Sequence, residues 1–155
     1  AQPLFGAAWH QGGLLCVCGV AMASGVVCDL RARMIPLECC AALLVAGGAY
    51  QLLRHGSIGI AEGAVAAAAV LAVCWTANRI ARKSGGSVGF GDIRCMTALA
   101  FACGPATLLG AAACYVSACA FSIAGMLTHR LGRRDGIPMA PFLSIWLAVG
   151  TTVLG

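Results

Sequence analysis

Residues 93–127, IRCMTALAFACGPATLLGAAACYVSACAFSIAGML, decide how this chain folds, because their 35 positions contain a single charged residue, Arg94. One continuous helix of this length would extend about 52 Å, against about 30 Å for the hydrocarbon core of a bilayer. A single span is therefore too long. Two spans fit the bilayer if the chain turns between Gly104 and Gly110. The Gly104-Pro105 pair is the break between the two apolar runs. We expect a short membrane helix followed by a second one.

The composition of the whole chain agrees with a membrane protein. Of 155 residues, 61% are hydrophobic and 10% are charged, whereas an ordinary soluble domain has about 25% charged residues. This excludes a soluble globular domain, a disordered chain and a nucleic-acid-binding module. Apolar runs lie at residues 12–28, 36–53, 58–78, 93–104, 106–127 and 137–154. The sequence predicts an all-α, polytopic membrane protein with about six transmembrane helices, forming a single domain over residues 1–155.

The basic residues between the apolar runs predict the orientation. The first, third and fifth connections carry nine of the ten Lys and Arg residues, counting Arg94, and the second carries only Arg54. Lys and Arg are enriched in short cytoplasmic loops. We therefore expect these three connections in the cytoplasm, both termini outside, and the cell membrane as the location. On this interpretation the net charge of +5 marks loops and does not indicate an anionic partner.

Two of the five acidic residues are predicted to lie at the same membrane face. Asp29 closes the first span and Asp92 opens the fourth, both on the cytoplasmic side. Acidic residues at spanning depth are costly and are therefore functional candidates. Two neighbouring carboxylates can share a proton, so that one activates water while the other protonates a carbonyl oxygen or leaving amine. This is the chemistry of an aspartic protease.

Helix ends suggest how the two acids divide their roles. Asp92 is expected to cap a helix N-terminus, which favours a carboxylate, whereas Asp29 lies at a helix C-terminus. Asp92 is then the predicted base and Asp29 the predicted proton donor. The alternatives are that Asp92 is merely a cap and that Asp29 pairs with Arg31 or Arg33. Asp135 is a third candidate on the same face.

The other ionisable residues show no pattern typical of a site. The ten cysteines lie in or at the ends of apolar runs without a CxxC pair, so we expect them to act as small apolar residues. The three histidines have no HExxH or paired spacing, and Glu38 and Glu62 lie near span ends where they reach water. We expect no metal, no cofactor, and no Ser or Cys nucleophile.

Three segments in order along the chain carry a resemblance to a known family. Residues 29–36, DLRARMIP, join an aspartate to an Ile-Pro pair; residues 89–94, GFGDIR, contain GxGD; residues 137–143, IPMAPFL, read IPxxPFL. Together they resemble the prepilin peptidases, the intramembrane aspartic proteases that remove the leader peptides of type IV prepilins. The resemblance covers the chain from about residue 12 to residue 150.

The resemblance implies that Asp29 and Asp92 are the two catalytic aspartates. Gly89 and Gly91 match the glycines beside the second one, where the lack of a side chain lets a substrate strand approach. It further implies an active site at the cytoplasmic face. Its substrate would be a prepilin or pseudopilin whose apolar helix stays among the membrane lipids during cleavage.

Other positions match the family pattern less closely. Pro36 and Pro138 match prolines that open the second and sixth spans, where a missing N–H costs nothing. Arg94 stands where the family often has Lys, which keeps the charge but not its geometry. Leu37 stands where Asn or Asp is common, and Met139-Ala140 replaces the usual Phe-Gly.

The resemblance is to the short, peptidase-only members that serve Flp-type pili, so we expect no methyltransferase activity. Three alternatives remain open: a GxGD protease with a non-pilin substrate, a non-catalytic membrane assembly factor, and a small transporter that uses the same acids as a proton relay. The sequence leaves the oligomeric state undetermined.

Overall fold

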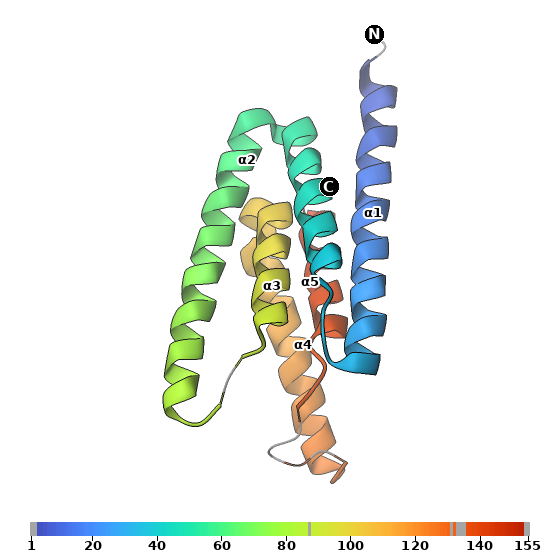
Figure 1. Ribbon diagram of the computed structural model, residues 1–155. Helices are drawn as coiled ribbons and strands as arrows, with labels where there is room; N and C mark the ends of the chain where they lie inside the picture. Colours follow the sequence, from blue (N-terminus) through green and yellow to red (C-terminus); the bar gives the residue numbers. More distant parts are fainter. Residues whose placement is uncertain (1–2, 87, 131, 133–135, 154–155) are drawn as a thin grey trace.

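The computed structural model describes residues 3–86, 88–130, 132 and 136–153, and over these ranges its regular structure is helical, without strands (Figure 1). The predicted all-α fold is confirmed. In chain order the helices are α1 (Pro3–Ala32), α2 (Leu37–Lys83), α3 (Phe90–Cys103), the 3₁₀ turn η1 (Gly104–Ala106), α4 (Thr107–Leu127) and α5 (Ala140–Val153).

Helix α2 folds back on itself at Gly56. The backbone there has φ 64° and ψ −147°, a conformation that glycine adopts without the penalty of a Cβ atom. Figure 1 shows the chain reversing at this point, and both halves reach α3. Gly47 in the first half lies against Ala102, and Gly63 in the second half lies against Phe101. The break agrees with the predicted connection between residues 53 and 58.

A second reversal separates α3 from α4 at Gly104–Ala106, where the long apolar stretch was predicted to turn. The Thr107 hydroxyl donates a hydrogen bond to the Ala100 carbonyl at 3.0 Å. Two turns further on, the Tyr115 hydroxyl reaches the Met96 sulfur at 3.5 Å. Helix α4 therefore runs back along α3. Its partner α3 has 14 residues and is about 21 Å long, so it is a short helix, as expected.

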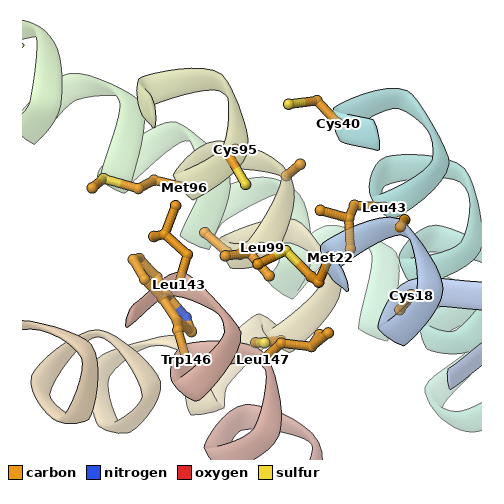
Figure 2. Close-up of a cluster of buried hydrophobic side chains, with 14 of the residues drawn as sticks. Cys18, Met22, Cys40, Leu43, Cys95, Met96, Leu99, Leu143, Trp146 and Leu147 are labelled. Carbon is orange, nitrogen blue, oxygen red and sulfur yellow. The ribbon is translucent and has the colours of Figure 1, made fainter. Parts of the chain in front are cut away.

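Helix α3 lies at the centre of the packing. Eight of its 14 residues are buried, and side chains from α1, α2 and α5 meet those of α3 in the core, as Met22, Leu43, Leu99 and Leu143 do in Figure 2. Small residues allow the helices to approach closely, for example where Gly110 of α4 faces the buried Trp146.

The outer surfaces of the helices are apolar, as expected of a protein surrounded by lipid. Large hydrophobic side chains such as Val45, Val65 and Val116 are about 70% exposed. Three helical stretches of the described chain, Trp9–Ala32, Leu37–Lys83 and Phe90–Leu127, are long and apolar enough to cross a membrane. Helix α5 is apolar but shorter. The chain is a membrane protein.

The turns of the chain gather at two opposite ends (Figure 1). Residues 33–36, 84–86, 88–89 and 136–139 lie at one end, and the Gly56 and Gly104–Ala106 reversals lie at the other. Contacts agree with the picture: a Cβ on Gly91 would lie 3.6 Å from the Ile35 backbone nitrogen, and one on Gly136 would lie 3.5 Å from Nη1 of Arg33. All three sequence motifs therefore meet at one end.

Candidate active site

Asp29 is a buried carboxylate held between two helix ends. It lies in the last turn of α1, is 6% exposed, and its carbonyl oxygen accepts the N–H of Arg33 at 2.8 Å. Its Oδ2 accepts a hydrogen bond from the backbone N–H of Ala140, the first residue of α5, at 3.1 Å. The first N–H groups of a helix lack partners within it, so this carboxylate satisfies one of them. Within the described chain, no ion pair joins it to Arg31 or Arg33.

Asp92 lies in the first turn of α3 and is half-buried. The predicted capping role of Asp92 is wrong: the cap residue is Gly89, and it makes no side-chain capping bond. The helix begins two residues before Asp92, at Phe90, because the backbone of the preceding Gly89 is extended. The Ile93 N–H then bonds to the Gly89 carbonyl at 3.2 Å. Asp92 keeps its place near the helix N-terminus but does not cap it.

The structure brings Asp29 and Asp92 together although 63 residues separate them in sequence. Asp29 lies in the last turn of α1 and Asp92 in the first turn of α3, and these two helix ends lie at the same end of the bundle (Figure 1). The dipole argument for their roles is weakened, because Asp29 faces the N-terminus of α5 as well as the C-terminus of α1. Asp135, the third candidate, lies outside the described residues.

The two motif glycines, Gly89 and Gly91, lie beside Asp92 and Ile35 respectively. A Cβ on Gly89 would be 3.4 Å from Oδ2 of Asp92, so the absence of a side chain leaves that carboxylate uncovered. Gly91 packs on Ile35 of the segment between α1 and α2. A side chain at Gly89 would contact the carboxylate of Asp92, whereas one at Gly91 would contact Ile35.

The remaining motif residues lie around this end of the bundle. Pro36 is the N-cap of α2, as expected for a proline that opens a helix. Pro138 lies two residues before α5, which begins at Ala140 and not at residue 137 as predicted. Arg94 is exposed one turn into α3 and lines a groove of about 410 Å³ with Leu37 and the first turns of α2.

Two features of this site were missed from the sequence. One is the backbone N–H of Ala140. Every residue except proline has such a group, so the residue type does not indicate this contact. The other is Asn78, a buried residue of α2 whose Oδ1 accepts the N–H of Val88 at 3.1 Å. An amide inside an apolar helix was the available signal, since buried polar side chains need partners.

Within the described residues, no group of three His, Cys, Asp or Glu side chains is arranged to hold a metal ion. All ten cysteines are free and six of them are buried, in keeping with a packing role. A groove of about 580 Å³ runs between α1 and α5. It includes Val26 and Val27, in the turn before Asp29, but not Asp29 itself.

These features define an all-helical membrane protein with two carboxylates at the same end of the bundle. The sequence profile of the type IV leader peptidase family matches residues 15–149. The chain therefore belongs to the type IV leader peptidase family and is a protease, in agreement with the predicted resemblance. Comparison with curated proteins and with solved structures gives no match.

Proposed function

We propose that this protein is an intramembrane aspartic endopeptidase that removes the leader peptide of type IV, Flp-like prepilins or pseudopilins. One observation carries the proposal: the last turn of α1, which holds Asp29, and the first turn of α3, which holds Asp92, lie at the same end of the bundle (Figure 1). A non-catalytic assembly factor would have no need of two neighbouring acids at this cost in free energy.

In the proposed reaction the carboxylate pair shares one proton. The ionised member takes a proton from a water molecule, whose oxygen attacks the carbonyl carbon of the scissile peptide bond. The protonated member gives its proton to the carbonyl oxygen, so that a gem-diol forms and the two carboxyls exchange roles. The member that took the proton from water then gives it to the leaving nitrogen as the C–N bond breaks, while the other member takes a proton from a gem-diol hydroxyl and the pair returns to its starting state. Asp29 and Asp92 are the catalytic residues, and no cofactor or metal takes part.

The other motif residues serve this pair. The bare backbone at Gly89 and Gly91 gives an extended substrate access to Asp92. Pro36 and Pro138 shape the segments leading into α2 and α5, and the exposed Arg94 supplies a positive charge in the groove that it lines with the first turns of α2.

We further propose six membrane spans in a single domain over residues 1–155, with both termini outside and the pair at the cytoplasmic face. Two observations support this. The chain reverses at Gly56 and at Gly104–Ala106, and the described parts of the three connections rich in Lys and Arg lie at the end where α1 finishes and α3 begins (Figure 1).

The test of function is cleavage of defined substrates by purified protein in liposomes. Leader-bearing Flp-type and type IV prepilins are compared with a matched single-span protein that lacks a leader, and products are mapped by mass spectrometry. We expect one cut, between the leader and the apolar helix of the prepilins only. Cleavage of the leaderless span instead would indicate a protease with a non-pilin substrate, and no cleavage of any substrate would contradict the proposal.

A further inference from the structure

The buried amide of Asn78 ties α2 to the loop that carries the second aspartate. Asn78 lies near the C-terminal end of α2 and is 4% exposed. Burying an amide is costly unless its polar atoms are hydrogen-bonded. Its Oδ1 accepts the N–H of Val88 at 3.1 Å. Val88 directly precedes Gly89, which is the N-cap residue of α3.

A second contact lies on the other side of Gly89. The guanidinium of Arg82 lies 5.7 Å from the ring centroid of Phe90, a distance at which a cation and an aromatic face attract each other. Arg82 is one turn beyond Asn78 on α2. The end of α2 therefore holds the chain at both neighbours of Gly89.

The position of Gly89 sets the position of Asp92. The Gly89 carbonyl accepts the Ile93 N–H at 3.2 Å and so closes the first turn of α3, in which Asp92 lies. Asp29 is held independently, through the Ala140 N–H. The separation of the two carboxylates thus depends on two separate anchors, and Asn78 is the buried one on the Asp92 side.

We propose that Asn78 is a positioning residue for peptide-bond cleavage, which holds Asp92 at the distance from Asp29 that catalysis needs. This inference rests on the proposed function. Asn78 is not a catalytic residue, because it bonds to the Val88 backbone and not to reacting atoms. It acts on the rate of the chemical step and leaves substrate affinity largely unchanged.

The test compares Asn78→Leu, which has a similar size but no acceptor, with Asn78→Asp, which keeps an acceptor oxygen. Gln51→Leu is the matched control, since Gln51 is also a buried amide of α2 but bonds to Ala102 at 2.8 Å, at the opposite end of α3. Per folded enzyme, Asn78→Leu should lower kcat about tenfold to a hundredfold with KM within about threefold. Asn78→Asp should have a kcat much closer to that of wild type than Asn78→Leu has, and Gln51→Leu should have the kcat of wild type.

The inference would be overturned if Asn78→Leu and Gln51→Leu lowered kcat equally, or if Asn78→Asp lowered kcat as much as Asn78→Leu. If Asn78→Leu does not fold, Asn78→Ala carries the same comparison. Hydrogen exchange at the Val88 amide is a separate readout: it should be slow in wild type and faster when the acceptor is removed. Fast exchange in wild type refutes the anchor even if prepilin is cleaved, whereas failure of wild type to cleave any prepilin refutes the proposed function instead.

Discussion

The carboxylate of Asp29 is fixed by a backbone group and not by a side chain. Its Oδ2 bonds to the N–H of Ala140 at 3.1 Å, so the segment ending in α5 contributes to the site through its main chain. An asparagine at this position keeps an oxygen acceptor for that N–H. Substitution of Asp29 by Asn therefore removes the ionisable group while leaving the packing of α1 on α5 intact.

Gly89 is the glycine whose replacement by alanine should lower catalytic activity most. Its Cβ would lie 3.4 Å from Oδ2 of Asp92, in contact with the carboxylate, and would partly cover it. We expect Gly89→Ala to lower kcat/KM for prepilin cleavage about tenfold to a hundredfold, because the added methyl group occupies the approach to a catalytic group and misplaces the substrate.

Gly86→Ala is the matched control for this substitution. Gly86 lies in the same loop, and a Cβ there would meet only the Ala81 carbonyl, at 3.7 Å, an ordinary contact. The control should cleave as wild type does. Steady-state cleavage in detergent compares the two variants, and equal rates for both would refute the argument from Gly89.

For this site, the sequence predicted that the two aspartates and the motif glycines lie at one end of the molecule. It did not predict the hydrogen bonds that hold them in place. Asp29 and Asp92 could be assigned to one face because charge in the connections orders the spans. The Asn78–Val88 and Asp29–Ala140 bonds join positions that no local pattern links. The capping role of Asp92 was predicted wrongly because residue type alone does not locate the first residue of a helix.

Between the elements, close contact of α2 with α3 depends on glycine. A Cβ on Gly47 would lie 2.9 Å from the Cα atom of Ala102, too close for either backbone to remain in place. Overpacking of this kind costs about 1–3 kcal/mol. We expect Gly47→Ala to lower the free energy of unfolding by that amount, as measured by thermal unfolding in detergent.

Gly13→Ala separates this packing effect from the intrinsic helix preference of alanine. A Cβ on Gly13 would meet no atom within 4 Å, so the substitution in α1 should be neutral or slightly stabilising. A loss of stability equal to that of Gly47→Ala would contradict the packing argument.

The helix boundaries were predictable where the chain itself breaks the helix. Gly56 and Gly104 have positive φ, and each lies where a charged or Gly-Pro interruption indicated a turn. The start of α5 was placed three residues too early, because the apolar character of residues 137–139 continues ahead of the helix. Hydrophobicity marks membrane depth, and it does not distinguish helix from extended chain.

For the whole molecule, the arrangement of the connections predicts the orientation in the membrane. The end that holds the carboxylate pair also holds most of the basic residues, so it should face the cytoplasm. A phosphatase that is active only outside the cytoplasm, fused after residue 56, should be active; fused after residue 85, it should be inactive. The opposite pattern would show that the membrane orientation is inverted.

The packing of the whole molecule was the part least accessible from sequence. The central place of α3 depends on which faces of the apolar helices meet, and the helices show little separation of polar and apolar faces. The three tryptophans illustrate this: Trp146 is 1% exposed, whereas Trp9 and Trp75 are 80% and 54% exposed. Composition alone gives no reason for that difference.

The central claim is that Asp29 and Asp92 act as one catalytic pair. The most direct measurement is prepilin cleavage by wild type, Asp29→Asn, Asp92→Asn and Asp135→Asn, each shown to be folded by its thermal transition. We predict that both pair variants lose cleavage by more than about a thousandfold while Asp135→Asn remains active. Cleavage that survives in both pair variants, or that is lost in Asp135→Asn but kept in Asp29→Asn, would contradict the account.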